Sequence, residues 1–514
     1  MIEGLMIVFS LSLIAVAVGM AIANILFGMV YDTDHFGDTV FLLGAGWRAL
    51  NGLTPVVDFG HFYGGVMAEG IGLTMRLFGP DVFAFERFTL LTYLVFIPAT
   101  VIILAGRMSA GGIAAVCLTL AVLLLTRYPL ELNDPIIRIV STHSFLYNRV
   151  GLGLVLVVGL FAILQSPEPK KDVVPGLLAG VGLGILALIK PTFAIFVPCA
   201  VLALVLQLRW HAIGAVTVGL VAFLAVYDPV LQKWSGALSY IQAQVGASNN
   251  ATLEALLRKS VQVPLYQPVA TAITVVAMIM IVRERRFLMP LLSLLIIAGG
   301  GVVMATTMGG NGSIGQLGIP LAILITSAFM ELRIADTNRT LFLRAATFAL
   351  VAAFALPHTL NLVGATIEGM NNSGAALIEQ GPYTRYLSIP ESPTRDGVPS
   401  QYEMMADGIT ALHALGDPSK WGIIADQNIT FEHAVLGRPV PDYPLWQRIT
   451  APELSSDKSI PDDADIVMIG RSGDMGEVGK HLQGRLLPDF MRCARSAHWY
   501  IFARLTSDVD CQID

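Results

Sequence analysis

Residues 31–65 read YDTDHFGDTVFLLGAGWRALNGLTPVVDFGHFYGG and follow directly on a long apolar run at 6–29. Three carboxylates, those of Asp32, Asp34 and Asp38, therefore stand where a helix would leave a lipid bilayer. Charged groups are costly near lipid, so such a cluster indicates either a solvated loop or a functional site. The stretch marks the start of a polar loop at a membrane surface.

The composition is that of a membrane protein. Of the 514 residues, 54% are hydrophobic and 14% are charged, which is about half the charge of an ordinary soluble domain. The chain contains repeated apolar runs that are long enough to cross a membrane. They exclude a soluble enzyme, a disordered protein and a small disulfide scaffold. No polybasic run points to nucleic acid. The sequence predicts a polytopic α-helical membrane protein.

The apolar runs predict about eleven transmembrane helices. Lys and Arg are densest in the short loops on one side, which is typical of the cytoplasmic side. We therefore place the N-terminus in the cytoplasm of a bacterial cell and the spans in its inner membrane. Because the number of spans is odd, the C-terminal part is expected in the periplasm. The expected spans are 6–29, 88–105, 109–126, 150–165, 173–189, 192–208, 212–227, 265–282, 287–306, 314–332 and 341–363.

Charge divides the chain into two parts. Residues 363–514 hold 21 acidic and 12 basic side chains, a net charge of −9, whereas the preceding part has a net charge of +3. We predict a transmembrane domain over 1–363 and a soluble extracytoplasmic α/β domain over 364–514. Cys493 and Cys511 lie in the latter and can pair in an oxidising compartment, which the sequence leaves open. The expected elements of this domain are a helix at 400–416 and strands at 421–425, 466–469 and 499–503.

The first outer loop, 30–87, contains two short amphipathic patterns. They cover 39–51 and 66–78 and are too short to cross a membrane. An aromatic turn with Asp and His joins them. We expect two helices that lie flat on the outer leaflet.

One motif in this loop is specific enough to suggest a family. The pattern Asp38…Gly52-x-x-Pro55-x-x-Asp58-Phe59, followed by Tyr63-Gly64, resembles integral-membrane glycosyltransferases of the GT-C superfamily. It is most similar to the polyprenyl-phosphate-sugar-dependent group that includes aminoarabinose transferases and protein mannosyltransferases. The resemblance implies a GT-C-like bundle with an outer C-terminal domain. It also implies inverting transfer of one sugar, hexose or pentose, from a polyprenyl-phosphate donor to an extracytoplasmic glycan or glycolipid.

The resemblance also implies site residues. Members of this group carry an acidic catalytic residue in the first outer loop. Many of them have an Asp-Glu pair at this position, where this chain reads Gly37-Asp38. By spacing to Gly52, Asp38 is the counterpart and the expected base, followed by Asp34 and Asp32. Hard oxygen ligands suit Mg²⁺, Mn²⁺ or Ca²⁺. Whether Asp34 and Asp38 hold such a cation is left open.

Substrate contacts are predicted on the same side of the membrane. Asp58 and His61 are expected to hold sugar or acceptor hydroxyls or to share a cation, and Tyr63 is expected to bind the substrate. A phosphate leaving group needs cations, and Arg149 and Lys190 are the expected ones, although snorkelling toward headgroups would explain either alone. For the nearby His143 we expect a structural role.

Two other functions fit a polytopic chain. A polysaccharide polymerase or ligase would have large outer loops rich in Arg and His, whereas this first loop is acidic. A lipid or sugar transporter would have charges near the span midpoints and a repeat between its halves. Few charges lie within the apolar runs, and no repeat is evident.

Overall fold

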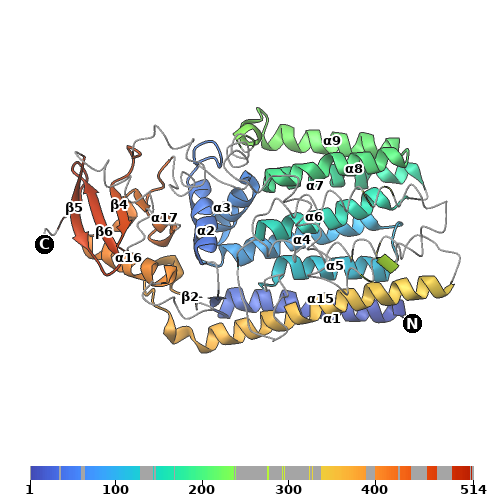
Figure 1. The fold of residues 1–514 in the computed structure, drawn as a ribbon, viewed down its shortest axis with the longest axis horizontal. Helices are drawn as coiled ribbons and strands as arrows, with labels where there is room; N and C mark the ends of the chain where they lie inside the picture. Colours follow the sequence, from blue (N-terminus) through green and yellow to red (C-terminus); the bar gives the residue numbers. More distant parts are fainter. Residues whose placement is uncertain are drawn as a thin grey trace.

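Apolar helices run side by side and form the larger part of the molecule (Figure 1). Among the described residues of the computed structural model, six segments are long and apolar enough to cross a membrane, and α5 and α8 are shorter apolar helices. The predicted polytopic α-helical class is confirmed. The helices are α1 (Ile2–Phe27), α4 (Ala84–Leu104), α5 (Ala110–Leu125), α6 (Leu146–Ile163), α7 (Val173–Ile189), α8 (Phe196–Leu206), α9 (Trp210–Tyr227) and α15 (Thr337–Asn371).

The structure describes residues 2–33, 36–59, 64–127, 143, 146–166, 168–236, 337–388, 400–425, 429–441, 460–471, 489–509 and 511, with isolated positions between 238 and 327. Eight predicted spans fall in these ranges, and each coincides with one of the helices above. The predicted spans 265–282, 287–306 and 314–332 lie outside the described residues apart from isolated positions.

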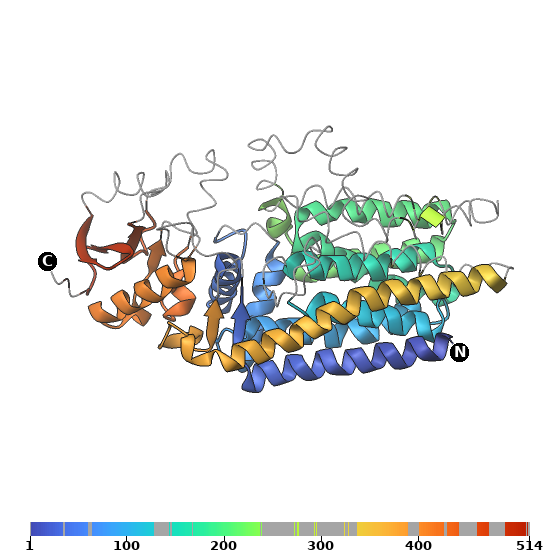
Figure 2. The same ribbon diagram turned by 60° about the horizontal axis from the view of Figure 1, so that its bottom comes forward.

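Among these eight helices, α15 differs most from the ends of its predicted span. This helix continues to Asn371, whereas the apolar run ends at 363. A helix satisfies its own backbone hydrogen bonds, so it need not stop where the apolar residues stop. As a result α15 runs alongside α1 and reaches the C-terminal domain (Figure 2).

Helices α7 and α9 approach backbone to backbone. A Cβ atom placed on Gly180 would lie 2.1 Å from the carbonyl oxygen of Val216, and one placed on Gly219 would lie 2.1 Å from that of Leu177. Small residues at such a crossing allow close packing within a membrane, where no hydrophobic effect drives helices together.

Gly219→Ala is expected to destabilise the protein by about 1–3 kcal/mol, because the added methyl forces α9 away from α7. Gly214→Ala is the matched control, since a Cβ at this position of the same helix meets no atom within 4 Å. Thermal unfolding in one detergent should show a lower Tm for the first variant only. Equal Tm values would mean that the close contact does not matter for stability.

Two short helices fill the first outer loop, as predicted. They are α2 (Phe36–Leu50) and α3 (Gly65–Phe78). Both are turned across the bundle axis, between the bundle and the C-terminal domain (Figure 1). They pack closely, because a Cβ on Gly72 would lie 2.8 Å from the carbonyl oxygen of Gly46.

The C-terminal part begins with a strand that returns to the first outer loop. Strand β2 (Tyr386–Ser388) pairs in parallel with β1 (Val30–Asp32), and Val30 faces Tyr386 in the register. The chain then forms α16 (Gln401–Leu415), which starts with a capping box between Ser400 and Glu403.

A mixed four-stranded sheet completes this part. Its order is β3-β4-β6-β5, with β3 and β4 parallel and the other pairs antiparallel. The predicted helix and three predicted strands are confirmed, whereas β5 was not predicted because its sequence lacks a β-branched run. The short helix α17 (Phe431–Ala434) faces α2. The strands are β3 (Ile423–Ala425), β4 (Ile466–Gly470), β5 (Phe490–Arg495) and β6 (Trp499–Arg504).

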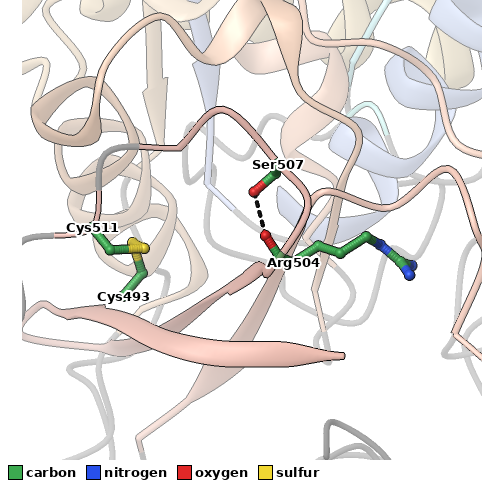
Figure 3. The surroundings of a disulfide bond; sticks show 4 residues. All are labelled: Cys493, Arg504, Ser507 and Cys511. Carbon is green, nitrogen blue, oxygen red and sulfur yellow. Dashed lines mark hydrogen bonds between the residues drawn. A yellow bond between two sulfur atoms is a disulfide. The ribbon is translucent and has the colours of Figure 1, made fainter. Parts of the chain in front are cut away.

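A disulfide links the end of the chain to the sheet. Cys493 in β5 is bonded to Cys511, so the pairing that the sequence left open is formed (Figure 3). The chain turns back after β6, where the Ser507 hydroxyl donates to the carbonyl oxygen of Arg504 at 2.6 Å. The cross-link holds Cys511 against the edge strand β5.

Candidate active site

Asp32 lies at the centre of a buried polar cluster. It is the last residue of β1 and is completely buried. Its Oδ2 accepts hydrogen bonds from the hydroxyls of Tyr386, at 2.7 Å, and Thr39, at 3.2 Å. The Nδ1 atom of His143 stands 3.6 Å from the same oxygen. Asp32 therefore joins the C-terminal part, α2 and the segment between α5 and α6.

His143 connects Asp32 to a second buried carboxylate. Its Nε2 is 2.7 Å from Oε1 of Glu86, in the first turn of α4, and Nη2 of Arg127 is 3.1 Å from the same oxygen. Burial alone would lower the pKa of His143, but the charge of Glu86 and hydrogen bonds to Asp32 and Glu86 outweigh it and raise that pKa above its usual value. The imidazolium form is thus favoured between two carboxylates.

Arg149 brings a further positive charge from α6. Its Nη1 donates to the carbonyl oxygen of Thr126, and its guanidinium interacts electrostatically with Asp32. A cavity lies between α4, α6 and the end of α5, and it is small and partly apolar. Its volume of about 20 Å³ is room for a single water molecule. The charged residues that line it are Glu86, Arg127, His143 and Arg149.

Asp38 lies next to this cluster. It is half-buried in the first turn of α2, where the helix dipole favours a carboxylate. Its neighbour Thr39 donates to Asp32, so both aspartates belong to the same corner of the molecule. Asp34 lies outside the described residues. Within the described residues, no group of three or more His, Cys, Asp or Glu side chains could hold a metal ion.

Asp58 closes a turn between α2 and α3. Its Oδ2 accepts a hydrogen bond from the backbone N–H of Thr54 at 2.6 Å. Val56 in this turn has φ 70°, a left-handed conformation that is unfavourable for a β-branched residue. The carboxylate of Asp58 thus helps to hold a strained loop. His61 and Tyr63 lie outside the described residues.

Lys190 follows α7 at the same end of the bundle. Its Nζ lies 5.2 Å from the ring centre of Tyr147, two residues before Arg149 in α6. Burial lowers the pKa of Lys190 to about 8. Backbone contact between Gly64 and Ile189, at 2.9 Å, ties this point to the first outer loop. The structure therefore brings the two predicted phosphate-binding cations to the first turn of α6.

The C-terminal domain is fastened to α2 by a buried ion pair. Arg48 Nη2 is 2.5 Å from Glu432 Oε2, and both side chains are fully buried. Burial raises the pKa of Glu432, and the charge of Arg48 opposes this only in part. The neighbouring Trp47 donates from its indole N–H to the carbonyl oxygen of Gly437 at 2.9 Å. The helix next to the polar cluster is thus held by the C-terminal part of the chain.

Comparison with known proteins places this fold. No protein-family model and no curated protein matches the sequence. The crystal structure of ArnT from Cupriavidus metallidurans in the apo state aligns over 97% of both chains, with a TM-score of 0.53 and 11% identity. The same enzyme bound to undecaprenyl phosphate aligns over 98% of both chains, with a TM-score of 0.52 and 13% identity. The chain has the GT-C fold.

A more distant structure is the archaeal oligosaccharyltransferase AglB from Archaeoglobus fulgidus, in complex with an inhibitory peptide and a dolichol-phosphate. It aligns over 90% of this chain and 69% of its own, with a TM-score of 0.40 and 11% identity.

Three residues of the polar cluster in this GT-C fold were not predicted from the sequence. Glu86 and Arg127 stand at the ends of apolar runs, and a buried charge at a membrane boundary is a usable signal. Tyr386 carries no such signal, because it lies 354 residues from Asp32 in the chain. His143, for which we expected a structural role, contacts both carboxylates of the cluster.

Proposed function

We propose that this protein is a membrane glycosyltransferase that moves one sugar from a polyprenyl-phosphate donor to an extracytoplasmic glycan or glycolipid. The supporting observation is the likeness over the whole chain to ArnT, one of whose structures is bound to undecaprenyl phosphate. The buried polar cluster at the α2–α3 end of the bundle is the proposed site.

The charges of the cluster favour a phosphate. Asp32 and Glu86 are faced by Arg127, Arg149 and a His143 whose imidazolium form is favoured. Arg127, Arg149 and His143 bring three basic groups to a buried place, where charges interact strongly, and Lys190 lies beside the first turn of α6. We assign Arg149 and Lys190 to the phosphate of the donor.

The reaction is a displacement at the anomeric carbon. A bond forms between the acceptor oxygen and this carbon, the bond from the carbon to the phosphate oxygen breaks, and polyprenyl phosphate leaves with the electron pair. The acceptor proton passes to a carboxylate. Attack opposite the leaving group inverts the anomeric configuration.

Asp38 is the proposed base, with Asp34 and Asp32 as alternatives. Asp38 is half-buried, whereas Asp32 is completely buried and accepts hydrogen bonds from Tyr386 and Thr39. His61 and Tyr63 are proposed to contact sugar or acceptor hydroxyls. Asp58 would serve mainly to shape the turn that begins at Thr54.

We place the site on the periplasmic side of a bacterial inner membrane, with the N-terminus in the cytoplasm. The distribution of basic residues supports this orientation. The bond between Cys493 and Cys511 agrees with it, since disulfides persist in oxidising compartments.

The direct test uses purified full-length protein in nanodiscs, incubated with lipid and glycan extracts of the host. Mass spectrometry follows the loss of polyprenyl-phosphate sugars and the gain of one sugar on an acceptor. Coupled loss and gain would support the proposal. If the folded protein consumes no donor with any acceptor fraction, the proposal is wrong.

A further inference from the structure

A residue of the C-terminal domain reaches into the polar cluster. The Tyr386 hydroxyl donates to Oδ2 of Asp32 at 2.7 Å, and both residues are completely buried. The contact joins the last position of β1 to the first position of β2, and the two strands pair in parallel. The other donor to this oxygen, Thr39, comes from α2. Asp32 is therefore held between the first outer loop and the C-terminal domain.

Tyr386 is itself held rigidly. The Tyr402 hydroxyl donates to its carbonyl oxygen at 2.8 Å, which fixes the backbone of β2 to α16. Its ring packs edge-on against Phe36, the first residue of α2, with ring centres 5.3 Å apart. A hydroxyl on so constrained a ring can hold a carboxylate in one place, because little motion is left to either group.

From this geometry we infer that Tyr386 is a positioning residue of the transferase site. It holds Asp32 so that this carboxylate faces His143 and Arg149 and anchors, through Thr39, the turn of α2 that carries Asp38. The inference rests on the proposed function. It makes the C-terminal domain a part of the site, since the domain supplies a hydroxyl that donates to Asp32.

Tyr386→Phe keeps the ring and removes only the hydroxyl. We expect kcat to fall by about 10–100-fold, the range for losing a hydrogen bond to a charged group, while KM for the donor changes little. A purely structural role would instead reduce the amount of folded protein and leave kcat per folded molecule unchanged. Both quantities come from initial rates, normalised to folded protein.

Tyr383→Phe is the matched control. Tyr383 is equally buried and lies three residues earlier, but its hydroxyl pairs with Nδ1 of His433 at 3.2 Å rather than with Asp32. We expect its kcat to stay within about twofold of the wild type, because an exchange away from the reacting groups has a small effect. Equal effects of the two substitutions on kcat would overturn the inference.

A double-mutant cycle tests whether Tyr386 acts through Asp32. If it does, Tyr386→Phe changes kcat little once Asp32→Asn is present, and the two effects are far from additive. Additive effects would overturn the inference. Should Tyr386→Phe fail to fold, 3-fluorotyrosine at position 386 keeps the ring and the hydroxyl, adds one fluorine, and makes the hydroxyl a stronger hydrogen-bond donor. An unchanged kcat with this residue would overturn the inference as well.

The outcomes separate this inference from the function on which it rests. A folded wild type that transfers no sugar overturns both. A wild type that transfers sugar, with Tyr386→Phe as active as Tyr383→Phe, overturns the positioning role alone.

Discussion

Asp38→Asn is expected to reduce sugar transfer by about 10²–10⁴-fold, the range for removing a general base. Asparagine keeps the size of the side chain in the first turn of α2, but it cannot take up the proton of the acceptor hydroxyl. The Tm should change little, because Asp38 is only half-buried. The measurement is the initial rate of donor consumption, with donor and acceptor saturating, for variants reconstituted in the same lipid.

Asp81→Asn is the control for Asp38→Asn. Asp81 is also an outer-loop carboxylate, but it pairs with Arg87 at 2.8 Å and lies beyond α3, outside the polar cluster. Its loss should leave the rate near that of the wild type. Asp34→Asn and Asp32→Asn complete the series. A full rate for Asp38→Asn with loss in one of these two would move the base there, and full rates for all three would remove the base from this loop.

Arg48→Met is expected to destabilise the protein by about 3–5 kcal/mol, the cost of leaving one partner of a buried ion pair uncompensated. Glu432 would then be buried without the cation that lies 2.5 Å from it. Because the pair fastens the C-terminal domain to α2, we expect its loss to lower the Tm and to reduce transfer as well. Thermal unfolding in detergent and the donor assay report the two effects.

The effect of Arg48→Met should depend on pH. Burial raises the pKa of Glu432 in the folded protein. A carboxyl with a raised pKa binds more protons in the folded than in the unfolded state, so its contribution to stability is present at low pH and is lost as pH rises through the folded pKa. Without the positive charge of Arg48, the pKa of Glu432 in the folded protein is raised further. The loss of Tm should therefore be greater at pH 8 than at pH 5.

Two variants control the experiment on Arg48. The double variant Arg48→Met, Glu432→Gln removes both charges and should recover part of the lost Tm. Lys171→Met breaks a pair of similar length, 2.8 Å to Glu168, whose side chains are 65% and 62% exposed. It should cost no more than about 1 kcal/mol. An equal loss for Arg48→Met and Lys171→Met would contradict the role assigned to burial.

The sequence alone determined the elements that depend on neighbouring residues. The apolar runs predict the helices because a span needs only length and a continuous apolar surface, both of which are local properties. The same holds for α2 and α3, whose amphipathic patterns are too short to span, and for α16, whose capping box at Ser400 marks its start. The acidic first loop was likewise recognised as a candidate site, because carboxylates at a membrane boundary are costly.

The tertiary structure alone decided which side chains meet. Asp32 was the last choice among the three aspartates, yet it is the one at the centre of the cluster. Helix α6 and strand β2 bring Arg149 and Tyr386 to it, and His143 links it to Glu86 of α4. The pairing of β1 with β2 and the ion pair of Arg48 with Glu432 join residues more than 350 positions apart. Neither contact leaves a periodic pattern in the chain, since each depends on a single buried residue whose partner is chosen by packing and by the cost of burying an unpaired polar group.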